Sequence, residues 1–466
     1  MGEEGGSQGR KKAAFYTLGC KVNQQETAAL QELFRQHGYE IVPFGSPADV
    51  YIINTCTVTH LADRKSRQMI RRAAAQNDRA VVAVVGCYAQ VAAEEVASLD
   101  GVDVVVGTQD RGRLVELVER AARRKEEGGD GAQIIAVRPL EEPGFEELPL
   151  PYTRIRTRAF LKIQDGCDQC CAYCIVPRAR GGIRSLKPEL VRERLERLLK
   201  AGYREVVLTG VHTSAYGRDL PGPHTLAGLL KELVLLPGEF RLRLSSVEPG
   251  EVTEDLLDVV AGSPRICRHL HIPLQSGDDE ILCLMRRPYT TAQYRELFHR
   301  IQAKIPGVAV TTDVMAGFPG ETDRHFENSY EFISSLPFRD LHVFKYSPRP
   351  GTPASRMPEQ IPPEVKELRS KRLRALAGEM AAAYAKRFVG EMLTVLAERR
   401  ARRRRDCWEG LSDNYLRVVF PALPEKQELR GAFIRVRILN RDGDALSGEP
   451  VLAAPRFPVE VDAGRF

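Results

Sequence analysis

Three cysteines near the middle of the chain have a spacing that could hold an inorganic cofactor. Cys167, Cys171 and Cys174 form a Cys-x3-Cys-x2-Cys pattern shortly after the apolar run AFLKIQ. Three thiolates from one loop can hold a [4Fe–4S] cluster and leave one iron open. That iron can chelate the amino and carboxylate groups of S-adenosylmethionine and pass it an electron. A zinc site, to which Cys170 could add a fourth ligand, and unliganded thiols are the alternatives.

A second group of cysteines is spread along the first hundred residues. Cys20, Cys56 and Cys87 each follow a short apolar run (AAFYTL, DVYIINT and AVVAVVG) and precede a helical pattern. Because the C-terminal ends of parallel strands share one edge of a sheet, the three thiols could converge in a second metal site. Alternatively, each is a small buried hydrophobic residue, as free cysteine often is. We interpret the more isolated cysteines as structural: Cys267, Cys283 and Cys407.

The elements that would position the second group form a regular alternation. Residues 13–125 alternate short apolar runs with amphipathic helical patterns near residues 24–37, 61–76, 90–99 and 111–124. This rhythm predicts a small parallel sheet with helices on its faces. Residues 126–152 are rich in Gly, Glu and Pro near both ends, which predicts a linker region around one short extended segment.

The first cysteine group belongs to a second alternation, in residues 153–388. Its six strand candidates are AFLKIQ, EVVLTG, RLRLSS, HLHIPL, VAVTTDVMAG and DLHVFKYS. Six units are too few for a complete eight-fold barrel and predict a partial (β/α)6 barrel, which would place the cysteine loop at the C-terminal end of the first strand. Residues 389–466 contain short strand-like runs between turn residues and predict a small β-barrel. The expected fold class is therefore α/β in three domains, with an all-β barrel at the C-terminus.

Polar residues at the predicted strand ends of the partial barrel are candidates for contacts to S-adenosylmethionine. Strand C-termini face the active site in this architecture, so hydroxyl, amide and carboxylate groups there could bind the cofactor. The candidates are Thr209, Gly210, Ser245, Glu248, Gln275 and Asp313. Alternatively, individual members cap helices or satisfy turns. We single out no catalytic side chain, because the radical chemistry would take place at the clusters.

The composition is that of a globular protein in a reducing compartment. The 466 residues are 43% hydrophobic and 28% charged, which excludes collagen-like, globally disordered and small disulfide-stabilised proteins. The N-terminal residues lack the apolar core of a signal peptide. The longest uncharged apolar-rich stretch, residues 80–93, is shorter than the ~20 residues of a membrane helix. We therefore expect a cytoplasmic protein with no membrane partner.

The distribution of basic residues points to a polyanionic partner more clearly than the net charge of +6 does. Eight basic residues flank the cysteine loop: Arg154, Arg156, Arg158 and Lys162 before it, and Arg178, Arg180, Arg184 and Lys187 after it. Six of the seven residues from 399 to 405 are arginine. Trp408 or Tyr415 nearby could stack on an RNA base. The alternative for residues 399–405 is a solvated charge run.

These stretches together resemble the methylthiotransferase family of radical S-adenosylmethionine enzymes over nearly the whole chain. TLGCKVNQQE, INTCTVTHLADRKSR and VVGCYAQ are similar to the family's N-terminal domain, and DGCDQCCAYCIVPRARGG is similar to its radical-cluster loop. HIPLQSGDDEIL and DVMAGFPGET resemble later barrel motifs, and the C-terminal β segment resembles a TRAM domain, an RNA-binding barrel. Within the family, CKVNQ and NTCTVT…ADRKSR resemble the MtaB subgroup. The departure is Cys170, where a bulkier residue without a thiol is expected.

The resemblance implies two sets of cluster ligands. The ligands of an auxiliary [4Fe–4S] cluster match Cys20, Cys56 and Cys87. The ligands of the radical [4Fe–4S] cluster match Cys167, Cys171 and Cys174.

The resemblance also implies a reaction and its partners. One S-adenosylmethionine donates a methyl group to a sulfur held at the auxiliary cluster. A second is cleaved reductively to methionine and a 5′-deoxyadenosyl radical, which abstracts hydrogen from C2 of the adenine. The implied substrate is N6-threonylcarbamoyladenosine at position 37 in the anticodon loop of tRNA, and the implied electron donor is a protein such as flavodoxin or ferredoxin. The source of the sulfur is left open.

Other functions remain possible at this point. The acceptor could instead be isopentenyladenosine at position 37 of tRNA or a ribosomal-protein side chain. An alternative of another class is a non-catalytic iron–sulfur or zinc RNA-binding module, which would form no 5′-deoxyadenosine from S-adenosylmethionine.

Overall fold

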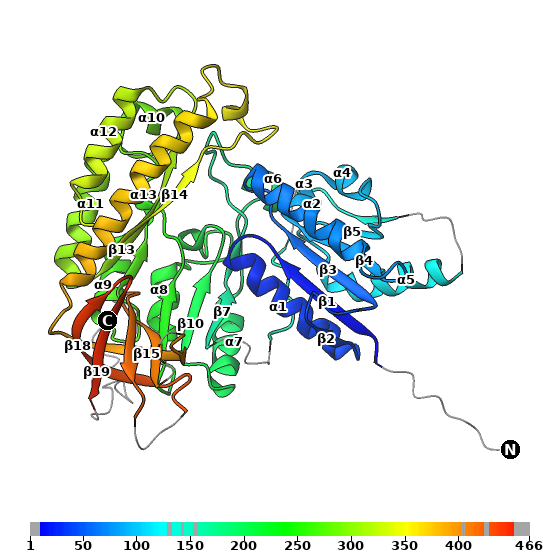
Figure 1. Ribbon diagram of the computed structural model, residues 1–466, viewed down its shortest axis with the longest axis horizontal. Coiled ribbons are helices and arrows are strands. Elements are labelled where there is room, and N and C mark those ends of the chain that lie inside the picture. Colours follow the sequence, from blue (N-terminus) through cyan, green and yellow to red (C-terminus); the bar gives the residue numbers. More distant parts are fainter. Residues whose placement is uncertain are drawn as a thin grey trace.

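A computed structural model describes residues 10–127, 133–140, 144–151, 157–402, 404, 406–423 and 428–451. Figure 1 shows an N-terminal α/β unit in blue and cyan on the right and a group of parallel strands in green and yellow in the middle. A β-barrel in orange and red lies at the lower left. The middle unit contacts both of the others, so it is placed to combine residues from all three.

The N-terminal unit is a parallel sheet with helices on both faces. Its strand order is β2-β1-β3-β4-β5-β6. The strands are β1 (Lys12–Thr17), β2 (Glu40–Val42), β3 (Val50–Thr55), β4 (Val81–Gly86), β5 (Val104–Val106) and β6 (Ile134–Ala136). One core packs α1 (Lys21–Gln36) and α5 (Leu114–Glu126) against one face of the sheet. A second core packs α2 (His60–Ala74), α3 (Cys87–Val91) and α4 (Ala93–Ala97) against the other face.

Two details of this unit differ from the sequence pattern. The helix expected over residues 90–99 is two short helices, α3 and α4, because Ala92 between them leaves the helical region at φ −138° and ψ 51°. The short extended segment expected within residues 126–152 is β6, which pairs in parallel with β5. Its Ile134 is buried against the sheet. Part of the expected linker region therefore extends the N-terminal sheet.

The middle unit contains all six predicted strands. They are β7 (Arg158–Lys162), β10 (Glu205–Thr209), β11 (Arg241–Leu244), β12 (His269–His271), β13 (Ala309–Ala316) and β14 (Asp340–Lys345). They form two parallel sheets, β11-β10-β7 and β12-β13-β14, which isolated bridges join at Leu242–Ile266 and Ser246–His271. The strands are covered by α7 (Pro188–Lys200), α8 (Leu226–Leu233), α9 (Glu254–Gly262), α10 (Asp279–Leu284), α11 (Thr291–Lys304), α12 (Asp323–Ser334) and α13 (Pro363–Lys386). The partial barrel is confirmed.

The C-terminal unit is a closed barrel with strand order β15-β16-β17-β19-β18. Its strands are β15 (Met392–Arg400), β16 (Cys407–Ser412), β17 (Arg417–Pro421), β18 (Phe433–Asp442) and β19 (Ala445–Val451). The core of this barrel also contains Tyr384 and Phe388, from the end of α13 and just beyond it. The barrel is therefore packed on the middle unit through a shared core, and the predicted fold class is confirmed.

A buried carboxylate also fastens the C-terminal barrel to the middle unit. Glu205 on β10 is fully buried and binds Arg241 at 2.7 Å and Arg243 at 2.8 Å. The same guanidinium groups donate to the carbonyls of Leu411 and Asp413 in the C-terminal barrel, each at 2.8 Å. Burial alone would raise the pKa of Glu205, but Arg241 and Arg243 hold it well below its usual range. The carboxylate therefore stays charged and keeps both arginines aimed at the barrel.

We expect Glu205→Gln to lower the free energy of unfolding of the C-terminal barrel by about 3–5 kcal/mol, because it leaves buried guanidinium groups without a counter-charge. The single tryptophan of the chain, Trp408, lies in that barrel, so its fluorescence in a denaturant titration measures the change. The matched control is Glu367→Gln, which removes an exposed ion pair to Lys345 and should cost less than about 1 kcal/mol. Equal stability of the two variants would contradict this role.

Candidate metal centres and substrate cavity

The N-terminal cysteines converge, as their positions in the sequence predicted. Cys20, Cys56 and Cys87 follow β1, β3 and β4, which are neighbours in the sheet, and all three line one cavity. The loops that carry them are tightly packed, since a Cβ added at Gly19 would lie 3.1 Å from the sulfur of Cys56. Cys20 is exposed, whereas Cys56 and Cys87 are buried.

Asn23, on the first turn of α1, ties two of these loops together. Its Nδ2 donates to the carbonyl of Leu18 at 2.8 Å and to the carbonyl of Thr55 at 2.9 Å, so it spans the residues that precede Cys20 and Cys56. Sequence reasoning missed Asn23. The only available signal was its position three residues after a cysteine, within CKVNQ.

The middle cysteines lie on a loop that begins after β8 (Gln164–Asp165) and ends at α6 (Val176–Arg180). Gly166 opens this loop with φ +73°, and a Cβ there would lie 1.7 Å from the carbonyl oxygen of Gly182, so only glycine fits. The backbone N–H of Cys167 then donates to the carbonyl of Gly181 at 3.0 Å, which closes the loop.

The sulfurs of Cys167, Cys171 and Cys174 each receive a hydrogen bond, as is common for thiolates that hold iron. The N–H of Gln169 donates to the sulfur of Cys167, and the N–H of Val176 to that of Cys174, both at 3.4 Å. The Arg287 guanidinium donates to the sulfur of Cys171 at 3.2 Å. Cys170 is exposed and contacts only the carbonyl of Asp168, at 3.8 Å, among the described residues. Its sulfur therefore receives none of the hydrogen bonds that the other three sulfurs receive.

The chemistry of both cysteine groups suits iron–sulfur clusters. Burial raises the pKa of Cys56, Cys167 and Cys174 to about 12, so these thiols need a bound metal to become thiolates. Among the described residues, neither triad has its three sulfurs within 4.8 Å of one another. A tetrahedral zinc ion, with Zn–S bonds of about 2.3 Å, needs its sulfurs about 3.8 Å apart. The three sulfurs of each triad are therefore not placed for a single tetrahedral zinc ion.

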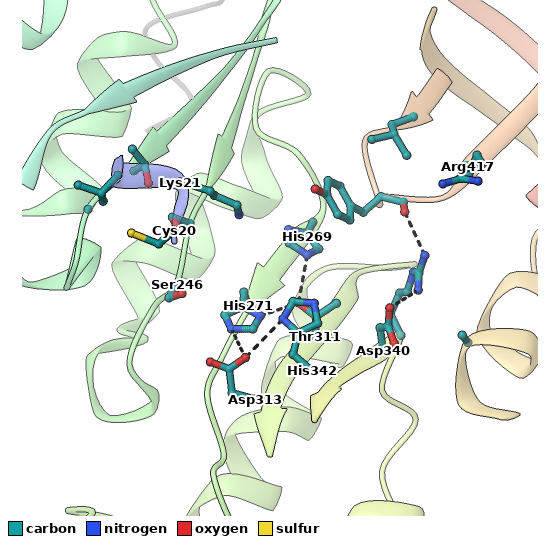
Figure 2. Close-up of a pocket in the computed structure, with 18 of the residues that line it drawn as sticks. Cys20, Lys21, Ser246, His269, His271, Thr311, Asp313, Asp340, His342 and Arg417 are labelled. Atoms are coloured by element: carbon teal, nitrogen blue, oxygen red, sulfur yellow. Dashed lines mark hydrogen bonds and ion pairs between the residues drawn. The ribbon is translucent and has the colours of Figure 1, made fainter. Parts of the chain in front are cut away.

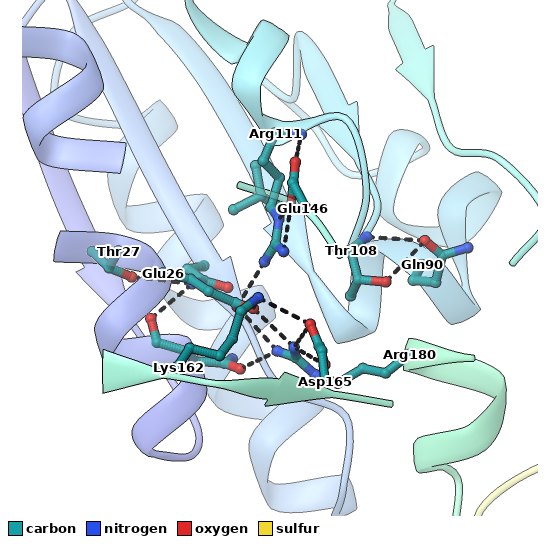
Figure 3. Close-up of polar contacts among 12 residues, drawn as sticks. Glu26, Thr27, Gln90, Thr108, Arg111, Glu146, Lys162, Asp165 and Arg180 are labelled. Atoms are coloured by element: carbon teal, nitrogen blue, oxygen red, sulfur yellow. Dashed lines mark hydrogen bonds and ion pairs between the residues drawn. The ribbon is translucent and has the colours of Figure 1, made fainter. Parts of the chain in front are cut away.

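A buried network of charges connects the two cysteine groups (Figure 3). Glu26 on α1 binds Arg111 at 2.7 Å, Arg180 at 2.9 Å and Lys162 at 3.1 Å. Arg180 and Lys162 also bind Asp165, at the start of the middle cysteine loop, each at 3.0 Å. Burial alone would raise the pKa of Glu26, but these cations hold it well below its usual range. The network therefore joins α1, which follows Cys20, to the loop of Cys167.

Arg180 makes the closest connection between the groups. Its Nη2 donates to the side-chain oxygen of Asn23 at 2.7 Å. The charge of its guanidinium group also interacts with the thiol of Cys87. Burial raises the pKa of the Cys87 thiol, and the charge and hydrogen bond of Arg180 oppose this rise. The end of α6 thus reaches the N-terminal cysteines directly.

These positions correct part of the expected RNA-binding surface. Of the eight basic residues that flank the middle loop, Lys162, Arg180 and Arg184 are buried and Arg158 binds Glu398 at 2.8 Å, so they stabilise the fold. Arg178 and Lys187 are exposed, and Arg154 and Arg156 lie outside the described residues. Trp408 is only 2% exposed, so it is not available to stack on a base. The reason is that partners far away in the sequence enclose these side chains.

The cavity lined by the N-terminal cysteines lies where all three units meet. Its volume is about 1010 Å³, enough for a nucleoside and a cofactor fragment. Four of the six predicted S-adenosylmethionine contacts line it, namely Thr209, Gly210, Ser245 and Asp313. Glu248 instead pairs with Arg287 beside Cys171. Gln275 is buried behind the wall and donates its backbone N–H to the carbonyl of Asp313 at 2.8 Å.

Figure 2 shows Asp313 between two histidines of neighbouring strands. Its carboxylate lies 3.2 Å from His271 and 3.4 Å from His342. Burial alone would raise the pKa of Asp313, but hydrogen bonds from these histidines hold it well below its usual range. The bond to Asp313 raises the pKa of His342. The cavity floor is thus a charged and hydrogen-bonded surface, of which the sequence analysis had singled out Asp313.

Comparison with known proteins agrees with this arrangement. Residues 12–107 match the uncharacterized protein family UPF0004, and residues 161–333 match the radical SAM superfamily. The solved structure of the radical S-adenosylmethionine methyltransferase TsrM from Kitasatospora setae, with cobalamin and a [4Fe–4S] cluster bound, is similar in fold. The TM-score is 0.56 at 16% identity, over 74% of this chain and 77% of that chain. No helix among the described residues is long and apolar enough to cross a membrane.

Several relatives carry the name threonylcarbamoyladenosine tRNA methylthiotransferase MtaB. The protein from Bacillus subtilis is 43% identical over 91% of this chain and 93% of its own length. The protein from Aquifex aeolicus is 40% identical over 78% of this chain and 87% of its own length. A tRNA-2-methylthio-N(6)-dimethylallyladenosine synthase from Moorella thermoacetica is 34% identical over 95% of this chain and 99% of its own length. The chain therefore belongs to the MtaB family of threonylcarbamoyladenosine tRNA methylthiotransferases, within the radical S-adenosylmethionine superfamily.

Proposed function

We propose that the chain transfers a methylthio group to C2 of N6-threonylcarbamoyladenosine at position 37 of tRNA, giving the 2-methylthio derivative. The reaction uses two S-adenosylmethionine molecules for each product, one as methyl donor and one as radical source. It also uses two [4Fe–4S] clusters. The radical cluster is held by Cys167, Cys171 and Cys174, and the auxiliary cluster by Cys20, Cys56 and Cys87.

The observation that carries this proposal is a cavity that the N-terminal cysteines share with strand ends of the partial barrel and with Arg180, which follows the middle cysteine loop. The N-terminal cysteines line the cavity, together with the strand ends Thr209, Ser245 and Asp313. Arg180, six residues after Cys174, reaches from the middle loop to Cys87. Bound at these cysteines, the two clusters and S-adenosylmethionine would supply the radical chemistry that an unactivated aromatic C–H bond requires.

The protein's own residues hold the reactants in register and exclude water. Arg287 and two backbone N–H groups stabilise negative charge on the sulfurs of the middle loop. Asn23 and Arg180 fix the N-terminal cysteine loops relative to that loop. The buried network around Glu26 resists relative movement of the two units, because separating them would expose unpaired charges at its centre.

The three units then have separate roles in the proposed reaction. Residues 13–125 carry the auxiliary cluster, residues 153–388 carry the radical cluster and S-adenosylmethionine, and residues 389–466 form a TRAM-like RNA-binding domain. Residues 126–152 connect the first two. The electron donor is a small redox protein such as flavodoxin or ferredoxin, and we place the reaction in the reducing cytoplasm.

The C-terminal barrel should contribute phosphate contacts through its exposed arginines. Arg402 and Arg404 are exposed at the end of β15, and replacing both with alanine should weaken tRNA binding. The slope of log K against log salt should fall by about 2, one unit for each phosphate contact. Deleting the whole barrel would be a poorer test, because it would leave the buried Arg241 and Arg243 without their carbonyl partners.

The control for this salt-dependence measurement is a second double variant, in which two exposed arginines outside the C-terminal barrel are replaced with alanine. Arg120 and Arg123 on α5 are also exposed, on the opposite side of the molecule in Figure 1. Replacing them with alanine should leave tRNA affinity unchanged. An equal loss in both double variants would contradict a specific role for the barrel.

The proposed function is tested by mass spectrometry of tRNA nucleosides. Anaerobically reconstituted protein is incubated with S-adenosylmethionine and a reductant, with tRNA carrying either threonylcarbamoyladenosine or isopentenyladenosine. A methylthio mass gain on the first tRNA alone is expected. A gain on the second tRNA alone would show that the acceptor is isopentenyladenosine. A gain on neither tRNA, with 5′-deoxyadenosine formed, would point to another acceptor such as a ribosomal-protein side chain. Absence of 5′-deoxyadenosine would favour the non-catalytic RNA-binding alternative.

A further inference from the structure

Lys21 is a cation in the cavity wall, and no acidic side chain in the described part of the chain contacts it. It is the first residue of α1 and follows Cys20 directly. Among the described residues, no hydrogen bond or ion pair joins its ammonium group to a partner. Asp313 acts on it electrostatically but is already bound by two histidines.

The arginines around Lys21, by contrast, each pair with a carboxylate, and Arg241 and Arg243 share Glu205. Arg158 binds Glu398 at 2.8 Å, and Arg243 binds Glu205 at 2.8 Å. Arg339, on the cavity wall, binds Asp340 at 3.1 Å. Lys21 is therefore the one of these basic residues that has no carboxylate partner in the described part of the chain. An unpaired charge in a partly buried site favours an anionic ligand, since the attraction is weakly screened there.

Tyr415 forms the part of the cavity wall that faces Lys21 and comes from the C-terminal barrel. Its ring stacks on His269, with centroids 4.7 Å apart and an interplanar angle of 26°. The residue has φ +64°, a conformation that is strained for a tyrosine, and its carbonyl accepts from Arg339 at 3.3 Å. Lys21 and Tyr415 interact electrostatically. In Figure 2, Lys21 and Cys20 lie on one side of the cavity, and His269 and Arg417 lie on the other.

We propose that Lys21 binds the carboxylate of the threonylcarbamoyl group on N6 of the target adenosine, which makes it a specificity-determining residue. This inference rests on the proposed function. C2 and C6 of adenine both adjoin N1, so a substituent on N6 extends along the ring edge that receives the sulfur. Lys21 adjoins Cys20 in the chain, so a base presented to the N-terminal cysteines brings that edge toward its ammonium group.

The same charge would discriminate against an uncharged substituent. A dimethylallyl group, which the name of the Moorella thermoacetica relative gives as its acceptor substituent, cannot neutralise Lys21. Binding such a group would bury the ammonium ion without a partner, and a site built for a polar group rejects a ligand that lacks it.

The test compares tRNA carrying the free threonylcarbamoyl acid with tRNA carrying its neutral methylamide. We expect the unchanged protein to prefer the acid by about tenfold or more in kcat/KM, the cost of leaving a desolvated charge unpaired. The difference should lie chiefly in KM, because the carboxylate is remote from the reacting carbon. In Lys21→Gln, the ratio of kcat/KM for the acid to that for the amide should fall to about one. Lys21→Arg keeps the positive charge and should keep the preference for the acid. Lys200→Gln, at the exposed end of α7, is the matched control and should keep the full preference.

The outcomes separate this inference from the proposed function. Methylthio product from both tRNAs with equal kcat/KM in the unchanged protein would overturn the role of Lys21 and leave the proposed function standing. An undiminished preference for the acid in Lys21→Gln, with normal iron content, would also overturn it. Methylthio product from neither tRNA would overturn the proposed function and this inference together. Because the acid and the amide are first compared on the unchanged protein, the test does not depend on cluster assembly in a variant.

Discussion

Replacing Cys171 with alanine is expected to abolish the formation of 5′-deoxyadenosine from S-adenosylmethionine. The residue is buried, and the Arg287 guanidinium donates to its sulfur at 3.2 Å, so the sulfur is held in a fixed position in the loop. Loss of an outer partner of a metal site alone costs about 10–100-fold in affinity or activity, so loss of a ligand should cost more than about 100-fold. Liquid chromatography with mass spectrometry measures 5′-deoxyadenosine, and tRNA binding should persist.

The adjacent residue provides the control for this experiment. Cys170→Ala removes a thiol from the same loop, but that thiol is exposed and receives none of the hydrogen bonds that the other three sulfurs receive. It should leave 5′-deoxyadenosine formation unchanged. If Cys170→Ala were inactive and Cys171→Ala active, the ligand register would be wrong by one residue. Activity in both variants would exclude the middle loop as the site of the radical cluster.

Replacing Cys87 with alanine is expected to remove the methylthio product while 5′-deoxyadenosine still forms. Cys87 directly follows β4 in the N-terminal unit. Burial raises the pKa of its thiol, although Arg180 opposes this rise. A bound metal is therefore needed to make Cys87 a thiolate. Without it the auxiliary cluster should be lost and the radical cluster kept, which would lower the iron content by about half. The two readouts are tRNA nucleoside masses and iron per protein.

A cysteine of similar burial outside both groups provides the control for Cys87→Ala. Cys267 is 1% exposed and lies just before β12, and burial raises the pKa of its thiol to about 12. Cys267→Ala should keep both the product and the full iron content. Normal methylthio product from Cys87→Ala would show that the N-terminal cysteines hold no essential cluster, and would reduce the proposed site to the middle loop.

Much of the candidate site could be predicted from local patterns. The spacing of Cys167, Cys171 and Cys174 is contained in one loop, so neighbouring residues determine it. The N-terminal cysteines are far apart in sequence, but each follows a strand, and parallel strands necessarily bring their C-terminal ends to one edge. Alternating apolar runs also indicated all six strands of the partial barrel, because burial of a parallel strand leaves a continuous hydrophobic signature. The family resemblance drawn from these motifs is confirmed by the relatives.

Only the tertiary structure decided which charged residues face solvent. Lys162, Arg180 and Arg184 look like an RNA-binding surface in the sequence, yet Glu26 and Asp165 enclose them. Asp165 is near these residues in the sequence, but Glu26 is 136 residues from Lys162 and 154 from Arg180, so no local pattern records the pairings of Glu26. The sequence alone does not distinguish a basic side chain that is exposed to solvent from one that pairs with a distant carboxylate.

The residues that line the substrate cavity also could not be predicted from local sequence, because contacts between distant parts of the chain bring them together. Lys21, His269 and Tyr415 come from three different units, and their meeting follows from how the C-terminal barrel is fastened by Arg241 and Arg243. The sequence by itself determined the cysteines that would hold the cofactors and the strands that carry them, because both are set by short-range patterns. The surroundings of the substrate were decided by contacts between units, where the burial of a charge depends on partners more than a hundred residues away.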